Sequence, residues 1–370
     1  MCRTFRWKTR RVDKYIVNAK LTAKINRVRT YSHQRLTLMK CLTLNAVKSP
    51  LQLEERPDLR PGPGEVVLKV KAAALNRRDF WITLGMYPGI ELPCVLGSDA
   101  SGIVMSCGEG VDQSWIDREV VFDPGLDWGD NPNVQHLNFN IMGLPGDGTF
   151  ATQVIVPASQ LYARPTHLDW IESAALPLAG VTAYRAVFTQ GSLQNGETVL
   201  ITGIGGGVAT FALQFAVAAG ARVWVTSSSS AKIDRAIQLG AEGGFDYRDD
   251  DWWKQMSKDV GAPQLIVDSA GGSGYRNLLN LADAGGRVVS YGATTGPPEK
   301  LDLFKLFWKQ LRLIGSTMGS PDDFTAMLKL VNEHKLRPVV DTVFPLEDGN
   351  IAVSRMNSSP QFGKYVLTNA

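Results

Sequence analysis

The spacing of hydrophobic and polar residues changes along the chain. Up to about Leu161, short apolar runs alternate with Pro and Gly turns such as RPGPGE at residues 60–65, which predicts β-strands joined by turns. From about Arg164 onward, apolar strand segments alternate with stretches of helical composition, as in a doubly wound parallel sheet. The predicted strands are Val66 to Ala73, Ala100 to Met105, Glu119 to Phe122, Phe150 to Val156, Thr198 to Thr202, Arg222 to Thr226, Leu265 to Asp268, Arg287 to Tyr291, Arg312 to Ser316 and, after a helix over Asp322 to His334, Lys364 to Leu367.

The segment over residues 197–241 has the pattern of a strand, a glycine turn, a helix and a second strand. Glycine lets the backbone approach a phosphate closely, and the first turn of a helix binds anions through its free N–H groups and its dipole. The alternative is a glycine-rich connection in some other parallel-sheet protein. The pattern predicts a dinucleotide site formed by Gly203, Gly205, Gly206, Gly207 and Val208.

The residues after the second strand indicate which dinucleotide binds. NAD enzymes are expected to place Asp or Glu there for the ribose hydroxyls, whereas this chain has four serines at residues 227–230, followed by Ala231 and Lys232. Hydroxyls and a cation suit the 2′-phosphate of NADP(H), which a carboxylate would repel. Ser227, Ser228 and Lys232 are therefore predicted to bind that phosphate. Alternatively, the serines cap a helix through Ser230 and Lys232 is a solvated charge.

Charge is distributed unevenly along the 370 residues. The chain has 39 Lys and Arg and 36 Asp and Glu, and its first 38 residues hold 11 of the basic residues and one acidic residue. The remainder therefore carries a net negative charge, which gives no general electrostatic reason to bind nucleic acid. No apolar run reaches the roughly 20 residues of a membrane span. We expect a small-molecule substrate and neither a nucleic-acid nor a membrane partner.

The basic leader, residues 1–38, lacks the apolar centre of a secretory signal. It is a gene-model extension ahead of Met39, an organelle transit peptide or a structured basic arm. The four cysteines form no C-x-x-C pair and the four histidines are scattered, so neither a disulfide framework nor a zinc knot is expected. The expected location is the cytoplasm, or the mitochondrion if the leader is a transit peptide.

Six motifs occur in the order typical of one enzyme family. They are A-L-N-R-R-D at residues 74–79, G-M-Y-P at 85–88, L-G-S-D-A-S-G-I-V at 96–104, D-G-T-F-A at 147–151, L-P-L-A-G-V-T-A-Y at 176–184 and the glycine turn. The chain resembles the medium-chain dehydrogenase/reductase family, in particular its zinc-independent quinone oxidoreductase and enoyl reductase branch. The resemblance implies a GroES-like β-rich catalytic domain over residues 39–163 and 310–370, a Rossmann NADP-binding domain over 164–309, an active site between them and a homodimer through the edge of the Rossmann sheet.

The positions at which the resemblance would place catalytic zinc ligands hold Asn76, Ser98 and Leu178. An amide, a hydroxyl and an isobutyl group cannot form a tetrahedral zinc site. The counterpart of the family's cysteine-bearing structural lobe, residues 122–146, contains no cysteine and is expected to fold without metal. We therefore expect no metal.

Without a Lewis acid, oxidation of a simple alcohol loses the group that stabilises its alkoxide. Hydride transfer to an already polarised acceptor depends less on such a group. Asn76 and Tyr87 are the catalytic candidates, since their spacing resembles enoyl reductases in which a tyrosine supplies a proton or hydrogen bond. Alternatively, Tyr87 only packs beside Pro88. Asp79 is expected to hold the loop.

The nicotinamide is expected to lie against Thr182, Gly292 and Ala293, and the adenosine near Tyr247. The expected function is an NADPH-dependent oxidoreductase that transfers hydride to a quinone or an α,β-unsaturated carbonyl. The alternatives are an alcohol/aldehyde dehydrogenase-reductase of the same family and a catalytically weak NADPH-binding redox sensor.

Overall fold

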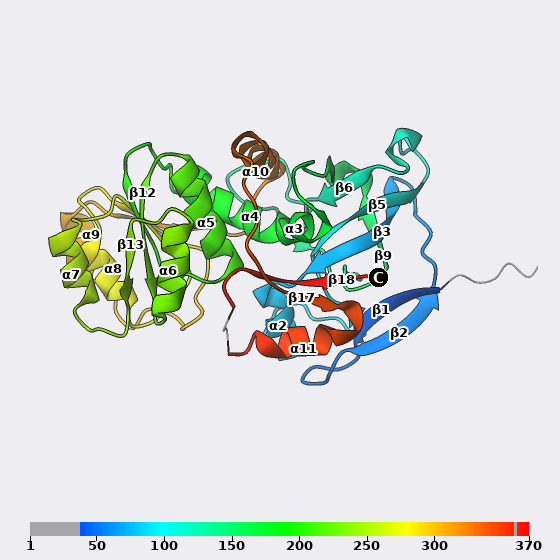
Figure 1. Cartoon of the computed structure of the whole chain (residues 1–370), viewed down its shortest axis with the longest axis horizontal. Coiled ribbons are helices and arrows are strands. Elements are labelled where there is room, and N and C mark those ends of the chain that lie inside the picture. The colour runs from blue at the N-terminus through cyan, green and yellow to red at the C-terminus, as the bar shows by residue number, and fades with distance from the viewer. Residues whose placement is uncertain (1–37, 359–360, 370) are drawn as a thin grey trace, which may run out of the picture. The chain divides into compact units, whose positions relative to one another are not determined.

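The computed structural model describes residues 38–358 and 361–369 (Figure 1). The first strand, β1, covers Leu38–Leu44, so the three interpretations of the leader lie outside the described residues except at Leu38. Within the described part of the chain, no helix combines the length and the hydrophobicity that crossing a bilayer requires.

The β-rich part contains a seven-stranded sheet in which β9 pairs with β3 beside the path β10-β6-β5-β3-β18-β17. Its strands are β3 (Glu65–Ala74), β5 (Asp99–Cys107), β6 (Glu119–Phe122), β9 (Gln153–Pro157), β10 (Leu161–Ala163), β17 (Val340–Pro345) and β18 (Lys364–Thr368). β1 also forms a small sheet with β2 (Gln52–Pro57) and β4 (Cys94–Val95), and β7 (Gly125–Leu126) pairs with β8 (Asn140–Ile141). Because β18 pairs antiparallel with β3, a strand near the C-terminus and a strand near the start of the described residues belong to one sheet.

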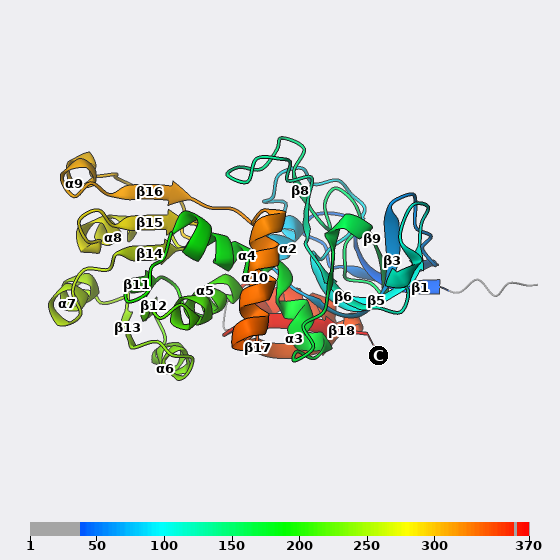
Figure 2. The same ribbon diagram turned by 90° about the horizontal axis from the view of Figure 1, so that it is seen from above.

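The second large sheet has six parallel strands (Figure 2). They are β11 (Thr198–Ile201), β12 (Arg222–Ser227), β13 (Gly243–Asp246), β14 (Leu265–Asp268), β15 (Arg287–Ser290) and β16 (Arg312–Gly315). Their order, β13-β12-β11-β14-β15-β16, reverses between β11 and β14, where a doubly wound sheet binds its ligand. The predicted fold class, a Rossmann sheet with a GroES-like β-rich part, is confirmed.

Alternate residues of the central strands face opposite layers of helices, as the two-residue period of a strand requires. Leu200, Ile266 and Val288 pack with α7 (Trp252–Asp259) and α8 (Tyr275–Leu281). Val199, Val267 and Val289 belong to a second apolar cluster that includes side chains of α4 (Pro177–Tyr184), α5 (Gly207–Ala218) and α10 (Pro321–His334). Both faces of the parallel sheet are therefore buried, which accounts for its continuous apolar strands.

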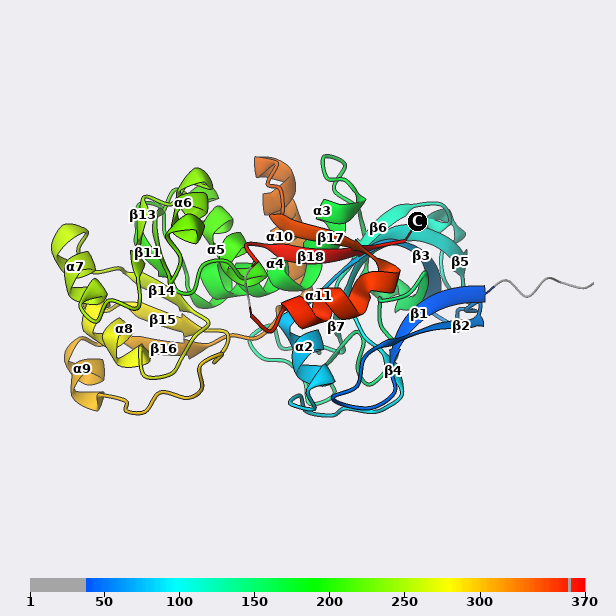
Figure 3. The same cartoon turned by 60° about the horizontal axis from the view of Figure 1, so that its bottom comes forward.

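The other helices are α2 (Arg77–Thr83), α3 (Trp170–Ala175), α4 (Pro177–Tyr184), α5 (Gly207–Ala218), α6 (Ser230–Gln238), α9 (Leu303–Trp308), α10 (Pro321–His334) and α11 (Gly349–Arg355). Capping boxes begin α2, α3 and α10, and in α10 Ser320 and Asp323 bond each other's backbone N–H groups. The helix α4 continues into a π-helical turn over Arg185–Gln190. Figure 3 shows α11 beside α2 below the C-terminal strands.

Several details differ from the sequence predictions. β9 begins at Gln153 rather than Phe150. The short strands β2, β4, β7, β8 and β10 were not predicted, and neither were β13, which opens with two glycines, and β17, which has two polar residues in its centre. β16 pairs with β15 in the parallel sheet although it follows residue 309. We therefore propose that the nucleotide-binding domain extends to Gly315.

Candidate active site

The glycine turn connects β11 to α5 with backbone conformations that favour glycine. Gly203 and Gly205 have φ values of +63° and +129°, where a side chain would strain the backbone. A Cβ on Gly205 would lie 3.1 Å from Nζ of Lys232 and 3.2 Å from the carbonyl oxygen of Gln361. Gly206 is the exposed N-cap of α5, and Gly207 and Val208 are half-buried in its first turn. This turn fits the approach of a pyrophosphate to a helix N-terminus.

The predicted 2′-phosphate residues lie beside this turn. Ser227 is buried at the end of β12, and its hydroxyl accepts a hydrogen bond from the backbone N–H of Ser229 (3.1 Å). Ser229 is the N-cap of α6 and its side chain makes no capping bond, so the expected cap by Ser230 is wrong, because Ser230 already lies in the helix. Ser228 and Lys232 are half-buried. Lys232 is therefore packed against the turn rather than fully solvated.

Burial lowers the pKa of Lys232, Asp341 opposes that effect, and the cations Arg235 and Arg77 add to it. Burial is therefore the main cause that destabilises the ammonium beside the glycine turn. A bound phosphate dianion would remove that penalty.

The other predicted cofactor residues follow or flank the carboxyl ends of the parallel strands. Thr182 lies in α4, is buried and donates to the carbonyl oxygen of Leu178 (2.7 Å). Gly292 and Ala293 follow β15 and are exposed. Tyr247 follows β13, is 50% exposed, and its backbone N–H donates to Ser227 (3.3 Å).

A buried hydrogen-bonded cluster joins Asn76, Asp99 and Lys364. Nζ of Lys364 donates to Oδ1 of Asn76 (2.5 Å) and to Oδ2 of Asp99 (3.1 Å). Nδ2 of Asn76 donates to the same carboxylate oxygen (2.9 Å), while the other oxygen of Asp99 accepts from the backbone N–H of Leu178 (2.8 Å). Because an ammonium only donates, it fixes which amide atom of Asn76 is the oxygen. One N–H of Asn76 remains for a further acceptor.

Lys364 also connects this cluster to the glycine turn. A Cβ on Gly207 would lie 2.6 Å from Cδ of Lys364, so the lysine stem passes directly over the start of α5. The preceding residue, Gly363, donates its N–H to the carbonyl oxygen of Gly205 (2.9 Å). The C-terminal segment therefore contacts both the predicted catalytic residue and the predicted cofactor loop.

A second polar group surrounds Tyr87. Nη1 of Arg78 donates to Oγ of Ser98 (2.7 Å) and to the carbonyl oxygen of Met142 (2.8 Å), and Ser98 donates to the same carbonyl (2.8 Å). The guanidinium carbon of Arg78 lies 5.0 Å from the ring centroid of Tyr87, and its Nε approaches the phenol oxygen at 3.4 Å. Tyr87 is half-buried, whereas Arg78 and Ser98 are buried, so Tyr87 is the member of this group with the most exposed surface.

Asp79 lies under the cluster and is fully buried. Its Oδ2 accepts from the backbone N–H of Asn76 (2.7 Å) in the capping box of α2, as expected for a residue that holds the loop. Its other oxygen has no hydrogen-bond partner among the described residues. Burial raises the pKa of Asp79 to about 6, while Arg78 opposes that effect.

The side chains at the predicted zinc positions do not fit a zinc ion. The described residues contain no group of three His, Cys, Asp or Glu side chains placed to hold a metal. Asn76 and Asp99 already bind an ammonium, and Ser98 is hydrogen-bonded to a guanidinium, so two fixed cations would repel a third.

Sequence reasoning missed Asp99, Lys364 and Arg78. Asp99 and Arg78 lie inside quoted motifs, and Lys364 begins the predicted last strand, yet 265 residues separate Lys364 from Asp99. No local sequence pattern predicts such a pair. The available signal was the presence of chargeable residues in otherwise apolar segments, since such residues are rarely buried unless paired.

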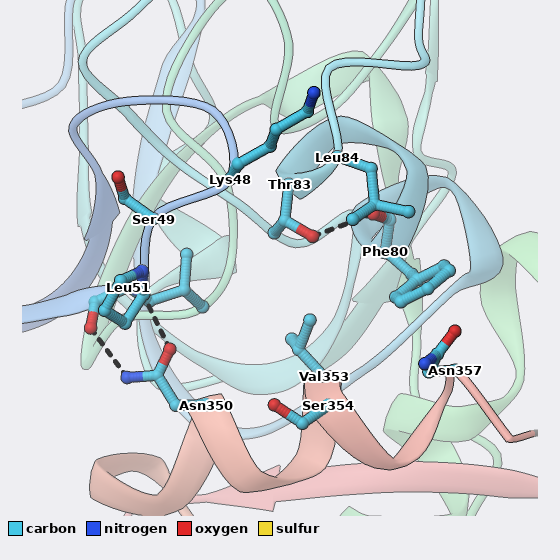
Figure 4. Close-up of a pocket in the computed structure, with 11 residues that line it drawn as sticks. Lys48, Ser49, Leu51, Phe80, Thr83, Leu84, Asn350, Val353, Ser354 and Asn357 are labelled. Atoms are coloured by element: carbon cyan, nitrogen blue, oxygen red, sulfur yellow. Dashed lines mark hydrogen bonds between the residues drawn. The ribbon is translucent and has the colours of Figure 1, made fainter.

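A cavity of about 440 Å³ lies between α2 and α11 (Figure 4). Phe80, Thr83 and Leu84 line it from α2, with Asn350 and Val353 from α11. None of the predicted site residues lines this cavity, and Asn350 is already bonded to the backbone of Leu51.

Comparisons with known proteins agree with the fold. Residues 62–166 match the alcohol dehydrogenase GroES-like domain, and residues 207–333 match the zinc-binding dehydrogenase family. The zinc-type alcohol dehydrogenase-like protein YogA of Leptosphaeria maculans is 34% identical, over 86% of this chain and 94% of that protein. Acryloyl-coenzyme A reductase of Metallosphaera sedula is 30% identical, over 89% of this chain and all of that protein. A crystal structure described as an NAD-dependent alcohol dehydrogenase has a TM-score of 0.85 at 34% identity, covering 90% of this chain and all of its own.

Proposed function

Because the chain belongs to the medium-chain dehydrogenase/reductase family, we propose that it is an NADPH-dependent reductase that transfers hydride to a quinone or an α,β-unsaturated carbonyl without zinc. The observation that supports the proposal is the cluster of Asn76, Asp99 and Lys364, in which an ammonium and a carboxylate bind Asn76, a residue at a position where the resemblance would put a zinc ligand. Hydrogen-bond donors of this kind stabilise an enolate or hydroquinone anion. The similarity to an acryloyl-coenzyme A reductase supports an activated alkene as the acceptor.

The residues around the glycine turn support NADPH as the cofactor. The ammonium of Lys232 lies against Gly205, and Ser227 presents a hydroxyl at the end of β12. Asp246 of the adjacent strand is in register with Ser227, but the guanidinium of Arg248 binds its carboxylate at 2.5 Å. We propose that this pairing leaves the 2′-phosphate site cationic, with Lys232 and the hydroxyls as its ligands.

The bound cofactor supplies the hydride. In the proposed mechanism, the remaining N–H of Asn76 donates to the acceptor oxygen on which negative charge develops. The ammonium on Oδ1 polarises the amide and strengthens that N–H as a donor, since hydrogen bonds in a chain reinforce one another. Asp99 holds the amide in place and balances the ammonium charge.

Tyr87 is the proposed proton donor. The guanidinium of Arg78 lies over the phenol ring and stabilises the phenolate that remains after the proton leaves. Reduction of an alkene then adds the hydride to the β-carbon and the tyrosine proton to the α-carbon, and water restores the proton. Reduction of a quinone needs the hydrogen bond from Asn76 but no proton from Tyr87, because the hydroquinone anion takes its proton from water.

The test is NADPH oxidation by the full chain with 1,4-benzoquinone, a 2-alkenal and a simple aldehyde. Turnover of the quinone or the alkenal at least about tenfold faster than that of the aldehyde is expected, because only those acceptors form a delocalised anion. Faster reduction of the aldehyde would instead indicate an alcohol/aldehyde reductase. Binding of NADPH without turnover of any acceptor would indicate a binding protein.

We also propose that the chain forms a homodimer through the edge of the parallel sheet. β16 is the edge strand, and the preceding helix α9 exposes Leu303, Phe304, Phe307 and Trp308 by 61%, 61%, 62% and 72%. Phe304 stacks on Trp308 with ring centroids 5.8 Å apart, so these side chains form one apolar patch. A second copy related by a twofold axis would cover both patches. Light scattering should give twice the chain mass for the wild type and the monomer mass for Trp308→Glu; a monomeric wild type would contradict the proposal.

We further propose a reducing location such as the cytoplasm, on the basis of the free thiols of Cys41, Cys94 and Cys107. Recovery of the tagged chain in a mitochondrial fraction would support the transit-peptide alternative for residues 1–38 instead.

A further inference from the structure

The guanidinium of Arg185 is buried where three segments meet. Arg185 begins the π-helical turn after α4 and is 2% exposed. Its Nη1 donates to Oδ2 of Asp323 in α10 (2.6 Å) and to the carbonyl oxygen of Pro132 (3.1 Å), while Nη2 donates to the carbonyl oxygen of Asn133 (2.7 Å). The guanidinium carbon lies 4.9 Å from the ring centroid of Trp128. One side chain therefore binds the loop over residues 125–144 at three residues and ties it to α10.

Apolar side chains do not hold the tip of this loop. Val134 and Leu137 are 53% and 98% exposed. Trp128 is buried, its Nε1 donates to the carbonyl oxygen of Asn131 (3.0 Å), and its own carbonyl accepts from the N–H of His136 (2.7 Å). The loop is thus folded around Trp128, and the guanidinium of Arg185 packs against the ring of this tryptophan.

The far end of the loop reaches the proposed acceptor site. The carbonyl oxygen of Met142 accepts from Arg78 and Ser98, next to Tyr87. Phe139, Ile141, Leu178 and Tyr184 all pack against one apolar cluster, and Trp128 is a buried member of that cluster. The ring of Phe139 meets that of Trp128 edge-on at 5.3 Å. A displacement of Trp128 would therefore disturb the packing of Phe139 against this cluster.

We propose that Arg185 is a positioning residue that holds the loop over residues 125–144 against the acceptor site and so sets which acceptor sizes are reduced. The assignment of the acceptor site rests on the proposed function. The effect on the loop does not, because it follows from the contacts of Arg185 alone. In the position of the family's metal-bound structural lobe, this chain uses a guanidinium with five donors in a fixed plane.

Arg185→Lys is the most informative variant. Its ammonium can still pair with Asp323, which avoids leaving a buried carboxylate without a counter-charge. A single nitrogen cannot occupy the places of both Nη1 and Nη2, so at least one loop carbonyl loses its donor. Trp128→Leu removes the stacked ring without touching the ion pair and serves if Arg185→Lys does not fold.

Arg164→Met is the matched control. Arg164 also stacks on a tryptophan, with its guanidinium carbon 4.7 Å from the ring centroid of Trp170, and it pairs with Glu119. Its hydrogen bonds go to Glu119, Pro165 and Leu168, outside residues 125–144, so the loop should be unaffected by its loss.

The first measurement is hydrogen exchange of peptides covering residues 126–142, with NADPH titration of the same samples. Exchange in Arg185→Lys and Trp128→Leu should be about tenfold faster or more, with NADPH affinity within about threefold of wild type. Unchanged exchange in both variants would overturn the proposal, whether or not the protein reduces any acceptor.

The second measurement compares KM and kcat for a short 2-alkenal and a bulky aryl-substituted enone. Both variants should raise KM for the short acceptor roughly five- to twentyfold, with smaller changes in kcat. The ratio of kcat/KM between the short and the bulky acceptor should therefore move closer to one. Equal losses of kcat for both acceptors with KM unchanged would show that Arg185 is only structural. Absence of wild-type turnover would refute the proposed function but leave the exchange result to decide the role of Arg185.

Discussion

The ammonium of Lys364 lies 2.5 Å from the amide oxygen of Asn76, although 288 residues separate them in sequence. This contact occupies the amide oxygen, so the part of the amide left for a ligand is an N–H donor. The lysine stem crosses Gly207 on its way to the amide, so the same side chain sets the distance between the glycine turn and Asn76. We propose that cofactor position and acceptor polarisation both depend on this one residue.

Replacement of Lys364 by Met should lower kcat on the best acceptor on the order of ten- to a hundredfold, because Asn76 loses the charge that orients and polarises it. The methionine keeps most of the stem over Gly207, so NADPH affinity should change by less than about threefold. Steady-state kinetics and cofactor titration measure both.

Loss of the lysine also leaves Asp99 buried without its counter-charge, so Lys364→Met/Asp99→Asn serves as the charge-balanced variant. Lys329→Met, at a 73% exposed side chain, is the control. A balanced variant that is stable and fully active would refute the role of Lys364.

Tyr87→Phe should reduce turnover of an alkenal by the equivalent of about 2 to 4 kcal/mol, the usual effect of losing a donor to developing negative charge. Turnover of a quinone should fall less, since its product takes a proton from water. If alkenal turnover stays within about twofold of wild type, Tyr87 only packs against Arg78.

Lys232→Ala should weaken NADPH binding about ten- to a hundredfold and leave NADH binding nearly unchanged, because only NADPH has the 2′-phosphate. Ser227→Asp should shift selectivity toward NADH by adding a ribose-binding carboxylate that repels the phosphate. Both cofactors are titrated against each variant at fixed ionic strength. Equal losses of affinity for NADPH and NADH in Lys232→Ala would show that the lysine binds a part of the molecule that both cofactors have.

The stability of the protein should depend on pH through Asp123. This carboxyl is 1% exposed, its Oδ1 accepts from the N–H of Gly125 (2.9 Å), and its Oδ2 has no partner among the described residues. Burial raises the pKa of Asp123 to about 7, and the nearby carboxylate of Asp323 adds to this while the Gly125 bond opposes it. The native state therefore binds the proton more tightly than the unfolded chain does.

The contribution of this proton to stability is complete below pH 4 and is lost as the pH rises through about 7. Asp123→Asn removes that dependence, so the free energy of unfolding of the variant relative to wild type should rise by about 2 to 4 kcal/mol between pH 5 and pH 8. Urea unfolding measures it, with Asp127→Asn in the exposed part of the same loop as the control. The same difference at both pH values would show that Asp123 is not protonated in the native state.

The fold could be predicted from the sequence because its signals are local. Apolar runs such as Leu265–Asp268 coincide with strands, and the glycines between Ile201 and Gly207 mark the turn directly. β17 was missed because the adjacent polar residues Asp341 and Thr342 interrupt its apolar residues, and it lies at the end of a sheet. The hydrogen bonds of β17 to β18 make it a strand, although its own sequence pattern does not indicate one.

The candidate site could be predicted only in part. Asn76 and Tyr87 stand in recognisable motifs, but a motif does not reveal which side chains bind them. The ion pair of Lys364 with Asp99 and the contacts of Arg185 with residues 128–133 join distant segments, and no periodicity encodes such contacts.

Zinc content measured together with activity tests the central claim most directly. We propose that Asn76, Ser98 and Leu178 stand where the family's zinc ligands would lie, and Lys364 already places a cation beside Asn76. Elemental analysis of the purified full chain should give well under one zinc per chain. NADPH-dependent turnover of a 2-alkenal should be unchanged after dialysis against a chelator. One zinc per chain, with turnover that the chelator abolishes and added zinc restores, would contradict the account.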